Sequence, residues 1–342
     1  MSYFNIHKGD KVMNAVLQNI RKTLKGRKKR EGRRSFGILL SLIVLCAIIA
    51  ILSPRFLTID NLRNVTSQAT VNAIVSIGLF LTILTGGIDL SVGSILALSI
   101  MMMGIFQVNL GLDPYLSMLL CLGVGSFVGL LNGLLLTKLK LPHPFISTMG
   151  TQKIARGLSL AVTAAAPISG FALPVQFLGS RSIGPIPVSV ILVVILYVVM
   201  YFFLINTATG RHIYAVGGNV EASRLSGINV DKVLCIVYTL SGFMAALGGI
   251  VLVGRVNAAY PLAGQDYETD AIAAVIIGGS SFSGGVGKIY NTVVGVLIIA
   301  VLRNGLNLLN VDSAFQTVAI GVVIILAVYL DVIRQKKSKI SK

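Results

Sequence analysis

Charged residues are scarce in this chain. Asp, Glu, Lys and Arg make up only 12% of its 342 residues, whereas a soluble domain carries roughly 25%. Apolar residues make up 55% of the chain. Because a soluble fold needs a charged surface, this composition excludes soluble enzymes and DNA-binding domains and predicts a polytopic membrane protein.

Residues that bind metals or catalyse reactions are also few. The three cysteines, Cys46, Cys121 and Cys235, are far apart and each lies in an apolar run, so we expect no disulfide framework and no metal site. The three histidines and the scattered carboxylates form no acid–base pair inside the apolar segments. We therefore expect this chain to hold no cofactor.

The net charge of +17 is concentrated in two tails. Residues 1–35 hold 11 Lys and Arg, and residues 334–342 hold five. Such tails beside a nearly neutral apolar body are typical of termini held against an anionic membrane surface, and without a DNA-binding motif no nucleic-acid partner is expected. We expect a basic cytoplasmic tail (1–35), a transmembrane domain (36–333) and a second basic cytoplasmic tail (334–342). Within the first tail, residues 11–25 either lie along the membrane surface as a helix or are solvated.

Ten apolar segments have the length of membrane-crossing helices or approach it. They are residues 36–53, 69–85, 91–110, 115–136, 145–165, 187–205, 233–254, 269–279, 288–304 and 314–331. The segment 269–279 is short for a full crossing, and a broken or partly re-entrant helix is the alternative there. Segment 36–53 is expected to be a retained anchor, because no small-residue cleavage site follows it. The predicted fold is an all-α bundle of about ten transmembrane helices.

The distribution of positive charge supports this count. With the N-terminus in the cytoplasm and ten crossings, the cytoplasmic segments hold 22 Lys and Arg and the external loops hold five. An excess of positive charge in cytoplasmic loops is the general rule for membrane proteins. The pattern therefore predicts that both termini are cytoplasmic. Lys153 and Arg156 lie within segment 145–165, either in mid-membrane or at a helix end near the cytoplasmic surface.

The longest polar connection, residues 206–232, contains a predicted docking element. Asn219 is a good N-cap residue, Val220 to Leu225 would form a short helix, and Gly227 would end it. A short helix of mixed polarity outside the bilayer has the shape of a docking element for a soluble partner. An ordinary re-entry loop is the alternative, although such loops are usually shorter.

Polar residues in or beside the apolar segments are candidates for a translocation path. In residues 85–93, Asp89 either caps the following helix or has a role in transport. The intramembrane amides either hydrogen-bond to hydroxyl groups of a transported molecule or join helices. The path candidates are Asp89, Ser91, Asn132, Asn304 and Asn307. On the external side, Gln265, Asp266 and Glu268 either meet an external partner or cap a helix.

Residues 278–288 are rich in glycine, but they do not form a phosphate-binding loop. That loop requires Gly-x-x-x-x-Gly-Lys-[Ser/Thr]. Here Phe282 stands five residues before Gly287, and Ile289 follows Lys288, so both ends of the motif fail. A flexible or closely packed inner turn is expected instead.

Together these segments resemble the permease subunits of ATP-binding-cassette (ABC) transporters that import ribose, xylose, arabinose, galactose and related sugars. The resemblance covers residues 57–328. It is carried by residues 86–93, 144–148, 210–230, 278–287 and 304–306. Residues 151–153 and the long basic N-terminal tail depart from the pattern of that family.

The resemblance implies a type II importer permease, in which two copies or two related permeases frame a central path. A cytoplasmic ATPase would bind and hydrolyse ATP, so this chain would not itself be catalytic. An external solute-binding protein would deliver the monosaccharide, with Gln265, Asp266 and Glu268 as candidate contacts. The ATPase would be coupled through Gly217, Gly218, Asn219, Glu221, Ala222, Arg224, Ser226, Gly227 and Ile228.

Two other functions stay open at this point. A permease for nucleosides or a furanosyl signalling molecule would have the same architecture. A stand-alone secondary transporter or channel belongs to a different class, and the scarcity of carboxylates within the apolar segments argues against it.

Overall fold

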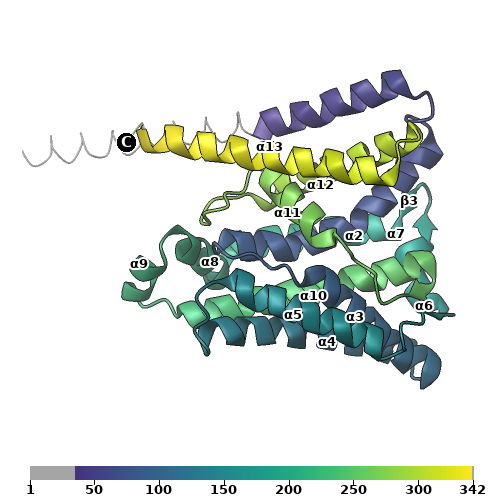
Figure 1. Cartoon of the computed structure of the whole chain (residues 1–342), viewed down its shortest axis with the longest axis horizontal. Coiled ribbons are helices and arrows are strands. Elements are labelled where there is room, and N and C mark those ends of the chain that lie inside the picture. Colours follow the sequence, from purple (N-terminus) through teal and green to yellow (C-terminus); the bar gives the residue numbers. More distant parts are fainter. Residues whose placement is uncertain (1–34, 341–342) are drawn as a thin grey trace, which may run out of the picture.

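The computed structural model describes residues 35–340, of which 330, 331 and 334–340 are described by their backbone alone. Helices lie at all ten predicted positions (Figure 1). The basic tail up to residue 34 and the segment 11–25 lie outside the described residues, as do the side chains of the second tail.

The described helices, with short additional ones between them, follow the order of the chain. They are Ser35–Leu52, α2 (Ile59–Leu84), α3 (Val92–Gly104) continued by the π-helix η1 (Ile105–Asn109), α4 (Pro114–Thr137), α5 (Pro144–Ala161), α6 (Leu173–Ser180), α7 (Val188–Asn206), α8 (Ala208–Gly218), α9 (Val220–Leu225), α10 (Val230–Val256), α11 (Tyr267–Ile277), α12 (Ile289–Leu308) and α13 (Ser313–Ile340).

Seven of these helices are long and apolar enough to cross a membrane, within the part of the chain that is described. They are Ser35–Leu52, α2, α3 with η1, α4, α7, α10 and α12. α5 and α11 are not among them, and α13 contributes only the shorter apolar stretch Ser313–Tyr329. The chain is therefore a helical polytopic protein, and the count of about ten crossings stays a prediction.

Polar caps decide where several helices begin. The Asp113 carboxylate accepts hydrogen bonds from the backbone N–H groups of Tyr115 and Leu116 at 2.9 and 3.1 Å, and Pro114 occupies the first turn of α4. Thr58 caps α2, which starts ten residues before the predicted apolar segment 69–85. The difference arises because most of residues 59–68 are polar, so hydropathy does not assign them to an apolar segment. In the structure they continue the same helix without a break.

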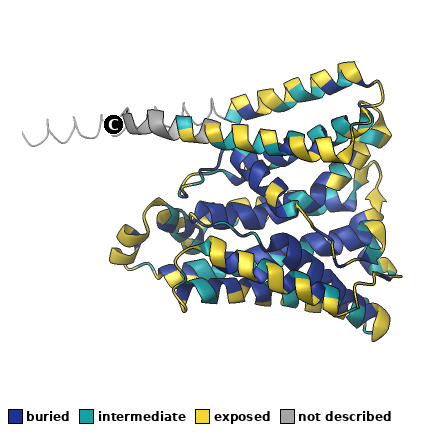
Figure 2. Ribbon diagram, in the orientation of Figure 1, coloured by how far each residue is buried: buried dark blue, intermediate teal, exposed yellow. Residues whose placement is uncertain are grey.

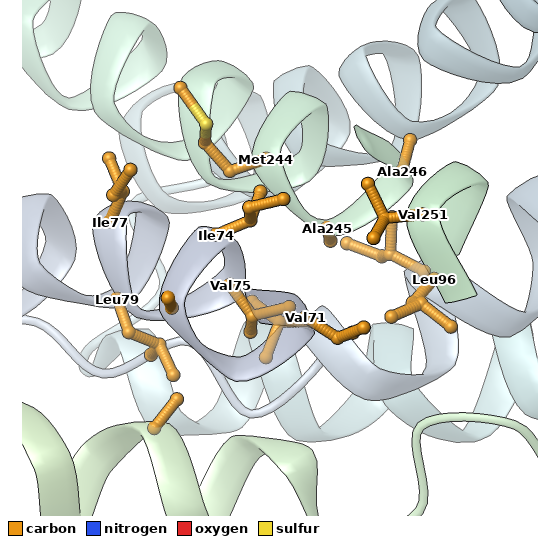
Figure 3. Close-up of a cluster of buried hydrophobic side chains, with 14 of the residues drawn as sticks. Val71, Ile74, Val75, Ile77, Leu79, Leu96, Met244, Ala245, Ala246 and Val251 are labelled. Atoms are coloured by element: carbon orange, nitrogen blue, oxygen red, sulfur yellow. The ribbon is translucent and has the colours of Figure 1, made fainter. Parts of the chain in front are cut away.

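α2 and α10 occupy the centre of the bundle (Figure 2). α10 contacts α2, α3, α4 and α6. Figure 3 shows Val71, Ile74 and Val75 of α2 packed with side chains of α10 and α3. Small residues allow the closest of these contacts, as is common between membrane helices. For example, a β-carbon on Gly129 of α4 would overlap the Tyr238 carbonyl oxygen of α10.

Short strands and α6 lie at the end of the bundle opposite α9 (Figure 1). β1 (Ile168–Ser169) pairs antiparallel with β4 (Ala258–Ala259), with Ile168 opposite Ala259. β2 (Ser182–Ile183) pairs with β3 (Ile186–Pro187) in a hairpin. On one side of the bundle, helix Ser35–Leu52 packs against α2 and α12, where Ile49 lies against Gly305 of α12.

Candidate functional site

α9 projects from one end of the helical bundle (Figures 1 and 2). We call this end of the molecule the α9 end. Leu225, the last residue of α9, is 89% exposed. A single exposed apolar side chain is common on protein surfaces. Leu225 differs from the other exposed apolar residues in its place on a short helix of mixed polarity that projects from the bundle.

Local hydrogen bonds fix both ends of α9. The Asn219 side-chain oxygen accepts a hydrogen bond from the Ala222 N–H at 2.9 Å, which is the geometry of an N-cap. Gly227 has a φ of +80°, and the Ile228 N–H donates to the Ser223 carbonyl at 3.0 Å. A left-handed glycine with this bond is the usual way to end a helix. The predicted helix from Val220 to Leu225 and both of its predicted ends are confirmed.

The side chains of α9 leave a mixed polar surface around Leu225. Glu221 and Arg224 lie one turn apart with 3.7 Å between their charged atoms, and both are exposed. An exposed pair of this kind contributes little to stability, so both charges are available to a partner. Of the other predicted coupling residues, Gly218, Asn219, Ala222, Ser226 and Gly227 are exposed, whereas Gly217 and Ile228 are half-buried.

Asp89, Ser91 and Asn132, three predicted path residues, lie in one buried polar cluster. One Asp89 carboxylate oxygen accepts hydrogen bonds from the Ser91 N–H and hydroxyl at 2.9 and 2.5 Å. The other accepts from the Ser241 hydroxyl at 2.8 Å. The Asn132 amide donates to the Ser91 hydroxyl at 2.8 Å. The cluster therefore joins the connection between α2 and α3 (residues 85–91) to α4 and α10.

Burial raises the pKa of the Asp89 carboxyl, which lies in the connection rather than in a spanning helix; hydrogen bonds from Ser91 and Ser241 act in the opposite direction. Two polar atoms beside it, the Asn132 side-chain oxygen and the Tyr238 hydroxyl, are buried without a hydrogen-bond partner among the described residues. The cluster therefore has hydrogen-bonding capacity that the chain itself does not use in this conformation.

Asn304 and Asn307 lie on α12 and bond to neighbouring helices. Asn304 and Asn61 of α2 exchange two hydrogen bonds of 2.8 and 3.0 Å between their amides. Asn307 accepts a hydrogen bond from Gln316 of α13 at 2.8 Å. Of the two alternatives drawn from the sequence, these contacts favour helix joining, and a role for these amides in a translocation path stays a prediction.

Gln265, Asp266 and Glu268 lie at the end opposite α9, between α10 and the start of α11. Gln265 and Asp266 are exposed, whereas Glu268 is 8% exposed and accepts a hydrogen bond from Gln152 at 3.0 Å. Arg156 of α5 donates to the Pro261 and Ala263 carbonyls at 2.7 and 2.8 Å. These contacts place Arg156 beside the connection that precedes α11, and the side of the membrane on which it lies stays a prediction.

One ionic contact in this half of the bundle was not predicted. Asp270 of α11 is 3% exposed, and its two carboxylate oxygens each lie 2.8 Å from the Arg303 guanidinium of α12. Asn72 of α2 donates to the same carboxylate at 3.3 Å. The signal in the sequence was two opposite charges within neighbouring apolar segments, 33 residues apart.

No cluster of three or more His, Cys, Asp and Glu side chains that could hold a metal ion occurs in the described residues. The backbone of the glycine-rich turn 278–288 contacts the end of α2: the Gly285 N–H donates a hydrogen bond to the Leu84 carbonyl at 2.8 Å. That contact is consistent with the closely packed turn expected from the sequence. That the chain holds no cofactor stays a prediction.

Comparison with protein families identifies the chain. A family model described as branched-chain amino acid transport system / permease component matches residues 61–328. This chain belongs to that family of permeases. The match includes α9, the Asp89 cluster and the Asp270–Arg303 pair, and it leaves out both basic tails.

Curated relatives of the permease carry the names of sugars. It is 45% identical over 307 residues to the ribose import permease protein RbsC of Bacillus subtilis, which covers 89% of this chain and 94% of the relative. It is 43% identical to the ribose import permease protein RbsC of Escherichia coli, over 86% of this chain and 92% of that one. Its identity to the D-allose transport system permease protein AlsC of Escherichia coli is 42%, over 86% and 91%.

These relatives confirm the resemblance to sugar-import permeases that the sequence motifs indicated. No solved structure matches the chain. With seven helices suited to membrane crossing in its described part, the permease is a multi-pass protein of a prokaryotic cytoplasmic membrane. Its relatives are transport subunits rather than enzymes.

Proposed function

We propose that this permease is the membrane subunit of an ABC importer that carries a monosaccharide, ribose or a similar pentose or hexose, into the cell. The observation that carries the proposal is α9, a capped and exposed helix at one end of a chain whose relatives are import permeases. ATP would be bound and hydrolysed by a separate cytoplasmic ATPase, so this chain would supply the path and the coupling.

The proposed ATPase docks on α9 through an apolar contact surrounded by charges. Leu225 would enter a groove of the ATPase, and Glu221 and Arg224 would exchange their weak mutual pairing for contacts with it. ATP-driven closure of two ATPase subunits would then move α9. A second copy of the permease, or a related chain, would complete the path.

The proposed topology has ten crossings with both termini in the cytoplasm. α5, α11 and α13 are added to the seven long apolar helices, which places both termini on the same side of the membrane. α8 and α9 then lie on that side, together with the basic tails. The excess of positive charge supports that side as the cytoplasm. The exposed Gln265 and Asp266 would face outward and contact a solute-binding protein, whereas Glu268 would act behind them through Gln152.

The proposed substrate class rests on the relatives and on the chemistry of the path candidates. Asp89, Ser91 and Asn132 offer hydroxyl, amide and carboxylate groups, which suit sugar hydroxyls, and the buried cluster has unused bonding capacity. A nucleoside or furanosyl signal has a similar hydroxyl pattern. The ligand of the partner binding protein distinguishes these substrates from one another and from a branched-chain amino acid.

Co-purification tests the proposal. The tagged full-length chain is extracted from its native membrane, and its partners are identified by mass spectrometry. We expect a cassette ATPase to be recovered with the unchanged chain and to be lost with Leu225→Asp. Leu262→Asp is the matched control, because Leu262 is also exposed (54%) but lies at the opposite end. Recovery of the chain without any ATPase contradicts the proposal, and equal recovery with both variants contradicts the role of α9.

A stand-alone ion-coupled transporter is the second candidate. The pair of the buried Asp270 with the partly exposed Arg303 favours it, because ionisable groups inside membrane helices often carry protons or ions. This candidate predicts sugar uptake by proteoliposomes that contain the permease alone and a proton or sodium gradient. The importer predicts no uptake under those conditions.

A further inference from the structure

Three segments that are far apart in the sequence meet behind α9. They are the end of α2 at Leu84, the end of α8 at Gly217 and the turn 278–288 between α11 and α12. The Gly285 N–H donates a hydrogen bond to the Leu84 carbonyl at 2.8 Å. This bond satisfies one of the carbonyls that a helix leaves free at its C-terminus. We call Gly86, Gly217, Gly284 and Gly285 the glycine junction.

The glycine junction is a contact between backbones. A β-carbon on Gly217 would overlap the Leu84 carbonyl oxygen and lie 2.5 Å from the Gly285 nitrogen. One on Gly284 would lie 2.8 Å from the Gly86 nitrogen and 2.9 Å from the Gly217 carbonyl oxygen. Gly284 and Gly285 have φ values of +79° and +68°, which side chains rarely allow. Since no flexible side chain separates these segments, a displacement of one is passed directly to the others.

The junction is attached firmly to the docking helix. Gly217 lies in the last turn of α8, and Asn219, two residues later, is the N-cap of α9. The Tyr214 hydroxyl on α8 also donates a hydrogen bond to the Gly287 carbonyl at 3.0 Å. α8 therefore contacts the turn 278–288 at two places, and no flexible linker separates these contacts from α9.

On its other side, the junction continues into the connection that holds Asp89. Gly86 contacts Gly284, and Thr148 of α5 donates a hydrogen bond to the Ile88 carbonyl at 3.2 Å. Asp89 itself bonds to Ser241 of α10. The glycine junction thus lies between α9 and the polar cluster that contacts α4 and α10, and α5 holds the connection between them.

We infer that Gly217 and Tyr214 are positioning residues for energy coupling. They hold α8 against the turn 278–288, so that movement of α9 reaches the Asp89 cluster and α11. This inference rests on the proposed function and deepens it. An ATPase bound to α9 would drive transport only while this backbone contact is intact. Loss of the contact would leave docking and ATP hydrolysis in place and separate them from transport.

The test compares a glycine of the junction with a glycine outside it. Gly217→Ala places a methyl group into the junction, whereas no described atom from elsewhere in the chain lies within 4 Å of a β-carbon added at Gly123 of α4. The full complex with its ATPase and binding protein is reconstituted, and three quantities are measured: the amount of assembled complex, ATP hydrolysis and sugar uptake. We expect Gly217→Ala to keep assembly and hydrolysis within two-fold and to lower uptake per ATP at least ten-fold. Gly123→Ala should keep the wild-type ratio.

Tyr214→Phe is the second variant, because it removes one hydroxyl and adds no bulk. We expect uptake per ATP to fall at least three-fold while assembly is unchanged. If Gly217→Ala does not assemble, the Tyr214→Phe ratio decides. A wild-type ratio in Tyr214→Phe, or in an assembled Gly217→Ala complex, overturns the inference but leaves the importer intact. Absence of ATP-dependent uptake in the wild-type complex overturns both.

Discussion

The two residues of the ion pair Asp270–Arg303 should differ strongly in their effect on stability. Asp270 is 3% exposed, whereas the Arg303 side chain is 39% exposed. Removing Arg303 leaves a buried carboxylate with only the 3.3 Å bond from Asn72, of those the structure describes. Removing Asp270 leaves a guanidinium that can turn towards the surroundings.

The magnitudes follow from this difference in burial. Loss of one partner from a buried ion pair costs about 3–5 kcal/mol, and we expect Arg303→Ala to fall in that range. For Asp270→Ala we expect about 1–3 kcal/mol, because exposure of the arginine recovers part of the cost. The double variant should cost less than the sum of the two single variants by about 1–3 kcal/mol.

The assay is the free energy of unfolding of the purified permease, measured by SDS titration in mixed detergent micelles. The exposed pair Glu221 and Arg224 provides the control, and its double-mutant cycle should give at most about 1 kcal/mol. Additivity within about 0.5 kcal/mol for Asp270 and Arg303, or a greater cost for Asp270→Ala than for Arg303→Ala, would refute the reasoning.

Three further predictions use the same assay. Ser241→Ala removes a hydrogen bond to the buried Asp89 carboxylate and should cost about 1.5–3 kcal/mol. The control Ser226→Ala, at an exposed serine, should change stability by less than about 0.5 kcal/mol. Equal effects would contradict a stabilising role of the Asp89 cluster. Gly129→Ala should cost about 1–3 kcal/mol through overlap with α10, but Gly123→Ala, with no described atom near its added β-carbon, should be neutral or gain up to about 1 kcal/mol. Asn304→Ala should cost about 0.6–1.7 kcal/mol and leave the apparent affinity for sugar unchanged; a changed affinity would place this amide in the path.

Local signals explain why α9 was predictable. Its N-cap, its helical residues and its terminal glycine lie within nine residues, Asn219 to Gly227, and each acts on its immediate neighbours. Membrane helices were likewise predictable as apolar runs, because hydropathy is a property of a short window. The start of α2 was missed because its first ten residues are polar and only the Thr58 cap marks them.

The Asp89 cluster was predictable only in part. Asp89 and Ser91 are neighbours in sequence, and their bond is a local turn. Asn132 was identified as an intramembrane amide, but nothing in the sequence paired it with Ser91. Ser241 looked like any small residue of an apolar helix, and the packing of α10 against α2 and α4 brings it to the carboxylate.

The glycine junction shows what sequence patterns leave out. Gly217 and Gly218 are adjacent and identical, yet a side chain at the first would collide with two backbones and one at the second would meet open space. The difference depends on where α2 ends and on the path of the turn 278–288, which are set by tertiary packing. The same holds for Asp270 and Arg303, whose helices must pack before their charges meet.

ATP-dependent uptake is the most direct test of the central claim, that this permease works as the membrane part of an importer. Proteoliposomes contain the permease with its co-purified ATPase, the binding protein is added outside, and radiolabelled ribose is measured in the lumen. We predict uptake only when ATP is enclosed in the vesicles, and its loss with Leu225→Asp. Equal uptake without ATP, or by the permease alone, would contradict the account.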